Sequence, residues 1–264
     1  MRFPLRAAMM AALFSLGGLT TGAQAGKIVV NHDDWTFRDV GFTNANPGAA
    51  TFALNIASYF AGGGTGNFLA YSNNPGLTGS TLANTLTGAG HTWTASLSVP
   101  FTLANLATYD GVFLTGNPGA YNATVLIDYV NGGGSVYLGG GSGYGGATFE
   151  ATNWNAFLNP FSLGFDTAGQ YNQVSGTRAV NSDLFLVDGV DSLFYANGLT
   201  VKRLQFDPNV RVFSFTSGFG ALALYDSELQ LPEAGTLALI VPGLVVLGFA
   251  ARRRRAARGA LGRA

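Results

Sequence analysis

Strand-like apolar runs alternate with helix-like amphipathic segments along the middle of the chain, and this alternation most constrains the fold. Residues 110–115 (DGVFLT) and 135–138 (SVYL) are short apolar runs of the strand type, whereas residues 121–131 and 147–159 have a helical spacing of apolar side chains. Glycine-rich turns separate the two kinds of segment. Strands that alternate with helices form parallel sheets, because each helix carries the chain back to the edge where it started. The pattern predicts an α/β domain with a largely parallel sheet.

The flanking sequence extends this pattern in both directions. Residues 27–30 (KIVV) predict a further strand, and residues 49–61 carry phenylalanine and isoleucine at four-residue spacing, as on one face of a helix. After Pro160, short apolar runs follow one another without helices, which favours antiparallel strands at an edge. We predict a flavodoxin-like, doubly wound sheet, mostly parallel with antiparallel edge strands, over residues 26–230.

The first 25 residues have the three parts of a secretory signal peptide. Two arginines lie among the first six residues, an apolar stretch follows, and Ala-Gln-Ala immediately precedes Gly26. A charged start, an apolar centre and a small-x-small pattern are what the export and cleavage machinery reads. We therefore predict that residues 1–25 are removed and that the body is exported. An N-terminal membrane anchor that is kept is the alternative.

The last part of the chain, residues 231–264, combines a short motif, an apolar run and a basic end. The apolar run over residues 235–251 holds no charge, and a helix of that length reaches roughly 25 Å, close to the ~30 Å hydrocarbon core of a bilayer. Arginines beside a membrane helix stay on the cytoplasmic side. We predict one transmembrane helix with the body outside and residues 252–264 inside. A buried C-terminal helix is the alternative. The motif is Pro232, Glu233 and Ala234, and the stop-transfer residues are Arg252, Arg253, Arg254 and Arg255.

This order of parts resembles the PEP-CTERM sorting signal of Gram-negative bacteria. The resemblance implies that an exosortase-type membrane peptidase recognises the tail and releases the protein outward. The inner membrane would then be a temporary anchor, and the cell surface or the extracellular space would be the destination. Ala234 departs from the family, whose motif is Pro-Glu-Pro. This departure bears on how efficiently the tail is processed.

The composition of the body narrows the classes of function. The chain has no cysteine, which excludes thiol nucleophiles and cysteine-ligated metals. Residues 26–230 carry six basic side chains against thirteen acidic ones, a net charge of −7, and such a surface does not attract nucleic acid. Glycine, asparagine, serine and threonine make the chain polar with few charges, which suits an extracellular, carbohydrate-rich setting.

The middle of the body contains the runs YDGVFLTG and GGGSVYLGGGSGYGG, followed by a predicted helix with a Trp-Asn pair. In these parts it resembles the class I glutamine amidotransferase-like superfamily, and is closest to its trehalose-utilisation-like branch. The resemblance covers about residues 27–191. It implies a nucleophile elbow in the turn over residues 139–146. Amidotransferases have a cysteine there, whereas this chain has Gly140, Gly141 and Ser142. Amidotransferase activity is therefore not expected, since serine without a base is a poor nucleophile.

Ser142 and His32 are the candidate catalytic residues. His32 ends the first predicted strand, and the carboxyl ends of parallel strands gather at one edge of a sheet, so the two side chains could meet there. Tyr144 stands where a G-x-S-x-G elbow has glycine. The alternatives are a glycine-lined turn that lets the next helix pack on the sheet, and a phosphate cradle, although no P-loop lysine follows the turn.

Three functions follow from these observations. The first is a non-catalytic exported cell-surface or extracellular-matrix protein, with no cofactor and no metal. The second is an exported hydrolase that uses Ser142 with His32, or a metal held at His32 and Asp33. The third is a carbohydrate-binding module, because ten tyrosines and three tryptophans could include a sugar-stacking platform. Extracellular polysaccharide is then a candidate partner.

Overall fold

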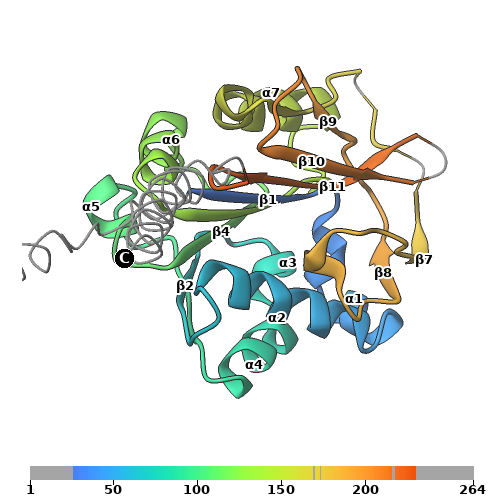
Figure 1. The fold of residues 1–264 in the computed structure, drawn as a ribbon, viewed down its shortest axis with the longest axis horizontal. Helices are drawn as coiled ribbons and strands as arrows, with labels where there is room; N and C mark the ends of the chain where they lie inside the picture. Colours follow the sequence, from blue (N-terminus) through green and yellow to red (C-terminus); the bar gives the residue numbers. More distant parts are fainter. Residues whose placement is uncertain (1–25, 169, 173, 216–217, 230–264) are drawn as a thin grey trace, which may run out of the picture.

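A seven-stranded sheet forms the centre of the protein (Figure 1). The computed structural model describes residues 26–229 apart from 169, 173, 216 and 217. The sheet has the strand order β10-β11-β1-β5-β4-β2-β3. Its strands are β1 (Lys27–Asn31), β2 (Asn67–Ala70), β3 (Thr92–Ala95), β4 (Gly111–Thr115), β5 (Ser135–Gly139), β10 (Val210–Ser214) and β11 (Gly220–Asp226).

The sheet is parallel over β1, β5, β4, β2 and β3, and antiparallel at one edge. β11 runs antiparallel to β1, and β10 runs antiparallel to β11. Val29 of β1 lies between Tyr137 of β5 and Leu224 of β11, at the junction of the two parts. All residues of β4 and β5 are buried, because helices cover both faces of a parallel sheet. A mostly parallel sheet with antiparallel edge strands is thus confirmed.

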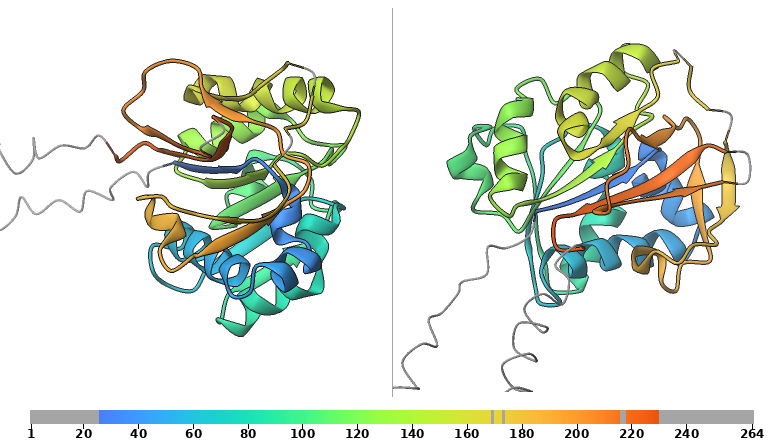
Figure 2. Two further views of the ribbon diagram at one scale, coloured as in Figure 1. Left: turned by 90° about the vertical axis from the view of Figure 1, so that its right-hand side faces the viewer. Right: turned by 45° about the horizontal axis from the view of Figure 1, so that its top comes forward.

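Helices cover the sheet on two faces, and each face has its own core (Figure 2). One face carries α2, in which Phe52, Ile56 and Phe60 are fully buried, as their spacing predicted. The other face carries α6 and α7, with Trp154 and Phe157 fully buried in α7. The first face has α1 (Asp39–Asn44), α2 (Gly48–Phe60), α3 (Pro75–Thr78) and α4 (Ser80–Gly88), and the second has α5 (Leu103–Leu106), α6 (Ala123–Asn131) and α7 (Ala147–Leu158).

Local sequence sets the starts of these helices. Asn122 caps α6, because its side-chain oxygen accepts hydrogen bonds from the backbone N–H groups of Thr124 and Val125 at 3.0 and 3.3 Å. Gly146 precedes α7 with φ of +87°, a conformation that a glycine adopts without strain. These two residues fix where the helices begin after the loops that follow β4 and β5.

The segment after α7 departs from the prediction of edge strands alone. Only β10 and β11 join the main sheet, while the rest forms two small antiparallel sheets, β6 with β9 and β7 with β8. The elements of this part and the short 3-10 helices are η1 (Asp34–Phe37), η2 (Asn159–Phe161), β6 (Leu163–Phe165), β7 (Gly176–Ala179), η3 (Phe185–Val187), β8 (Ser192–Tyr195) and β9 (Val201–Arg203).

The connections after β1 and after β5 run over opposite faces of the sheet. The helices that follow β1 belong to the first core, and α7, which follows β5, belongs to the second. Neighbouring parallel strands whose connections diverge leave a crevice at their carboxyl ends, the usual ligand position of such sheets. Within residues 26–229, no helix is both long and apolar enough to cross a bilayer. The predicted signal peptide (1–25) and tail (231–264) lie outside the described residues.

Candidate functional site

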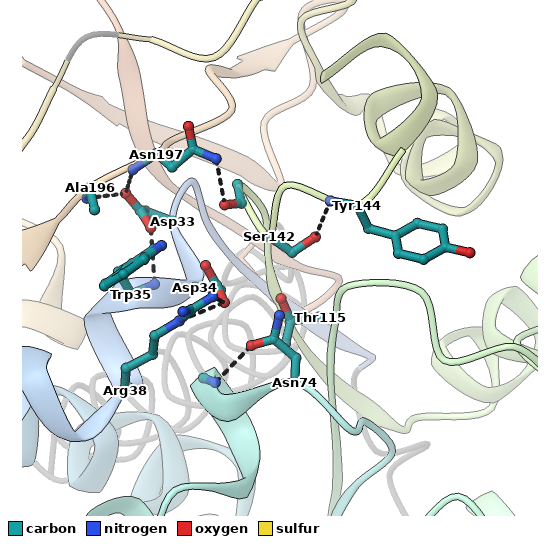
Figure 3. Close-up of polar contacts among 12 residues, drawn as sticks. Asp33, Asp34, Trp35, Arg38, Asn74, Thr115, Ser142, Tyr144, Ala196 and Asn197 are labelled. Carbon is teal, nitrogen blue, oxygen red and sulfur yellow. Dashed lines mark hydrogen bonds and ion pairs between the residues drawn. The ribbon is translucent and has the colours of Figure 1, made fainter. Parts of the chain in front are cut away.

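The carboxyl edge of the sheet gathers polar side chains from four strands (Figure 3). Asp33 and Asp34 follow β1, Thr115 ends β4, Asn74 follows β2, and Ser142 lies in the glycine loop after β5. Each of these residues lies at the end of an apolar strand or within four residues after it, where the parallel arrangement brings strand ends together. The edge therefore has the composition of a polar site placed on a rigid sheet.

Asp33 accepts hydrogen bonds that hold a distant part of the chain, at Ala196 and Asn197, against this edge. Its Oδ1 accepts the N–H of Trp35 at 2.9 Å, and its Oδ2 accepts the N–H groups of Ala196 and Asn197 at 2.6 and 2.7 Å. Burial raises the pKa of the Asp33 carboxyl to about 6, although these three backbone donors and the charge of Arg38 oppose the shift. Both carboxylate oxygens of Asp33 are thus occupied by backbone groups.

Residues 196–199, which we call the crossing segment, cover the ends of β1 and β5. The Asn197 side chain donates to the carbonyl of Gly141 at 3.2 Å, and the N–H of Leu199 donates to the carbonyl of His32 at 2.8 Å. A Cβ at Gly141 would lie 2.1 Å from the carbonyl oxygen of Asn197, and the φ of Gly141 is +71°. The crossing segment therefore packs directly on the glycine loop and lies across the carboxyl ends of β1 and β5.

Asp34 lies beside the crossing segment, with one oxygen bound and the other free. Its Oδ2 accepts two hydrogen bonds from Arg38, at 2.8 and 3.1 Å, and the Arg38 guanidinium stacks on Trp35 at 4.0 Å. Its Oδ1 is buried and has no hydrogen-bond partner within the described part of the chain. Burial raises the pKa of Asp34 to about 7, Arg38 lowers it, and the charges of Asp33 and Glu150 raise it.

Asp34, Asn74, Thr115 and Ser142 together form what we call the Asp34 cradle (Figure 3). Thr115 is buried, and its Oγ1 also lacks a hydrogen-bond partner among residues 26–229. A Cβ at Gly139 would lie 3.4 Å from Thr115 Oγ1 and one at Gly116 would lie 3.6 Å from Asn74 Nδ2, so two glycines line the cradle at contact distance. The Asp34 and Thr115 oxygens are thus enclosed at this edge of the sheet.

Ser142 is held by the glycine loop and by α7. Its N–H donates to Glu150 Oε1 at 2.9 Å, and its Oγ accepts the N–H of Tyr144 at 3.3 Å. Glu150 Oε2 accepts the hydroxyl of Tyr171 at 2.9 Å, and burial raises the pKa of this carboxyl. Positive φ values at Gly141, Gly143, Gly145 and Gly146 agree with the prediction of a glycine-lined turn.

His32 is placed at the same edge, but its hydrogen bonds lead away from Ser142. The ring is fully buried, its Nδ1 lies 3.1 Å from Asn172 Nδ2, and its centroid lies 4.5 Å from that of Tyr195. Its Nε2 has no partner in the part of the chain that the structure describes. Burial lowers the pKa of His32 to about 3, so the imidazole is neutral at physiological pH. The predicted hydrogen-bonded Ser142–His32 pair is absent from the described residues.

The predicted alternative of a metal at His32 and Asp33 gains no support from the geometry. The described residues contain no group of three or more histidine, aspartate or glutamate side chains arranged to hold a metal ion. Both Asp33 oxygens already accept backbone hydrogen bonds, and His32 Nδ1 faces Asn172. These ligand atoms therefore serve the structure of the edge.

Asp34, Asn74 and Thr115 were not predicted from the sequence to lie beside Ser142. A signal was present, because each lies at the end of an apolar run or within four residues after it. Their convergence depends on the order of strands in the sheet, which the sequence pattern does not contain. Comparisons with protein-family models, with curated proteins and with solved structures found no match to this chain.

Proposed function

We propose that the chain is an exported cell-surface or extracellular-matrix protein whose body binds a ligand without transforming it. In this proposal a signal peptide directs export, and the tail holds the protein in the inner membrane until an exosortase-type peptidase releases it. The sequence motifs at the two ends of the chain support this route of export and release. The carboxyl edge of the sheet supports a role in binding.

The observation that carries the binding role is the environment of Ser142 and His32. Serine becomes a useful nucleophile when a base accepts its proton, and the base must lie within hydrogen-bond reach. Ser142 Oγ is engaged with the N–H of Tyr144, and the His32 ring is enclosed beside Asn172 and Tyr195. The crossing segment also packs against the backbone of His32 and of Gly141, between the two candidate residues and the rest of the edge. These contacts count against hydrolysis by a Ser142–His32 pair, and binding is the role that we propose in its place.

Activity assays on the purified full chain test this proposal. The wild type is compared with Ser142→Ala and with Ser98→Ala, which alters an exposed serine far from the cradle in sequence. We expect that none of the three proteins hydrolyses chromogenic esters or glycosides above the rate without protein. Hydrolysis by the wild type and by Ser98→Ala that disappears in Ser142→Ala would refute the proposal and establish the exported hydrolase.

A further inference from the structure

We infer that the amino edge of the body contacts the surface of the inner membrane, through exposed apolar side chains around the point where the chain leaves the sheet. This edge is the one at which β1 begins and β11 ends. The inference rests on the membrane anchor proposed for the tail, and it adds a contact surface on the body itself. Its support comes from side-chain exposure, from hydrogen bonds at the end of β11 and from the short connection to the predicted membrane helix.

Asp226, the last residue of β11, fixes the point at which the chain leaves the body. Its N–H donates to the carbonyl of Asn209 at 3.1 Å, and its own carbonyl accepts the N–H of Leu229 at 3.1 Å. Its carboxylate accepts the hydroxyl of Tyr59 and, at 2.8 Å, the N–H of Glu228. The end of β11 is thus bonded both to α2 and to the loop that precedes β10.

Three exposed apolar side chains from separate segments lie around the end of β11, and we call them the exit patch. Phe206 is 82% exposed and lies in the β9–β10 loop, three residues before Asn209. Leu229 and Phe185 are each 41% exposed, and the Phe185 ring packs on Tyr59 with centroids 4.8 Å apart. The left view of Figure 2 shows the β9–β10 loop on the side at which the described chain begins and ends. Single exposed apolar side chains are common, whereas a group at one place marks a contact surface.

Basic side chains accompany Phe206, although the body as a whole is acidic. Lys202, Arg203 and Arg211 are three of the body's six basic residues, and the body has a net charge of −7. The Arg203 guanidinium lies over the Phe206 ring at 5.6 Å. Such side chains keep their charge among lipid head groups while an adjacent ring enters the interface. Because Lys202 is already paired with Asp166 at 3.0 Å, apolar insertion should dominate the contact.

The short connection to the tail identifies the bilayer as the occupant of the exit patch. Five residues, 230–234, separate Leu229 from the apolar run over residues 235–251. A chain extends at most about 3.5 Å per residue, so Leu229 stays within about 20 Å of the start of the predicted membrane helix. At that distance the effective concentration of membrane surface is high. A few apolar side chains then suffice for contact, although they would not recruit the protein from solution.

Quenching of a fluorophore by spin-labelled lipid tests the contact on the full chain. Since the chain has no cysteine, single cysteines can be labelled at Gln205→Cys, beside Phe206, and at Ser98→Cys, exposed beyond β3 at the opposite edge. The labelled chains are reconstituted in vesicles of phosphatidylethanolamine and phosphatidylglycerol with a spin label near the head group. We expect at least threefold more quenching at position 205 than at position 98. High salt should leave this difference unchanged, because the contact is apolar.

Phe206→Ala, made in the chain labelled at position 205, is the test variant. Its matched control is Phe149→Ala, because Phe149 is 51% exposed but lies in α7 just after the glycine loop. Neither change disturbs the core. Phe206→Ala should reduce quenching by at least half, and Phe149→Ala should leave it unchanged.

Four outcomes would overturn the inference, and they separate it from the proposed anchor. Equal quenching at the two labelled positions, or quenching unaffected by Phe206→Ala, would overturn the membrane contact and leave the anchor standing. A blue-shifted emission at position 205 without lipid quenching would assign the exit patch to a protein partner instead. Release of the full chain from the vesicles by alkaline carbonate would refute the anchor itself, and the inference with it.

Discussion

Asp34 should make the protein less stable as the pH rises, and Asp34→Asn should remove this effect. The pKa of the carboxyl is 3.8 in its ordinary environment and about 7 in the folded protein, because burial outweighs the attraction of Arg38. The folded state therefore keeps a proton over a range of pH in which the unfolded state has lost it. The contribution of the protonated Asp34 carboxyl to the free energy of unfolding is fully present below pH 3.8 and is lost as the pH rises through about 7.

The size of this effect follows from the shift in pKa. The difference between the two pKa values corresponds to about 4 kcal/mol once the pH is above the folded-state value, and to about 2 kcal/mol at pH 5. Asparagine has nearly the same shape and carries no charge at any pH. Asp34→Asn should thus gain roughly 2–3 kcal/mol on the wild type between pH 5 and pH 8, or about 5–10 °C in melting temperature for a domain of this size.

Thermal and urea unfolding at pH 5 and pH 8 measure this difference directly. Asp39→Asn is the matched control, because Asp39 is exposed and its pKa is lowered by hydrogen bonds from Thr81, so its effect does not change over this range of pH. A stability difference between Asp34→Asn and the wild type that stays constant or shrinks from pH 5 to pH 8 would contradict the buried-charge explanation.

Three further predictions address the crossing segment, the core and the tail. Gly141→Ala should cost about 2–4 kcal/mol in urea unfolding, because the methyl group meets a backbone oxygen at 2.1 Å, whereas Gly119→Ala, with φ of +67° and open space, should cost only about 1–2 kcal/mol; equal costs would show that the crossing segment does not pack on the loop. Trp154→Ala should cost about 3–5 kcal/mol by the same assay, since the side chain is fully buried, and a cost below about 1 kcal/mol would contradict its place in the core. Replacing Pro232 and Glu233 by alanine should keep the protein in the inner membrane of a host with the sorting peptidase, as measured by fractionation and immunoblot; unchanged release would argue against recognition of this motif.

The sequence predicted the central part of the fold well, for physical reasons that are local. β4, α6, β5 and α7 are each specified by an apolar run or a helical spacing and are separated by glycines, so neighbouring residues determine them. The strand pairings in the last third of the chain were harder to predict from the sequence. Strand β9 pairs with β6, and that choice depends on contacts between segments that no local pattern connects.

The candidate site was predicted in location but not in its contacts. Parallel strands bring His32 and Ser142 to one edge, as expected, but their side chains bond to other groups. The deciding contact is between Asp33 and the backbone of Ala196 and Asn197, which lie more than 160 residues later in the chain. A contact between residues so far apart in the sequence depends on tertiary packing. The free oxygens of Asp34 and Thr115 likewise became recognisable only in three dimensions.

The two ends of the described body lie side by side, so a tether at either end would attach at the same edge of the sheet. Lys27 and Asp226 face each other across β1 and β11, and the N–H of Ser227 donates to the carbonyl of Gly26 at 3.2 Å. Both ends belong to the amino edge of the parallel sheet, while the Asp34 cradle belongs to the opposite edge, about 17 Å away along a five-residue strand. A tether attached beyond residue 229 would therefore hold the protein at the amino edge of the sheet and leave the edge that carries Asp34, Asn74 and Ser142 on the opposite side.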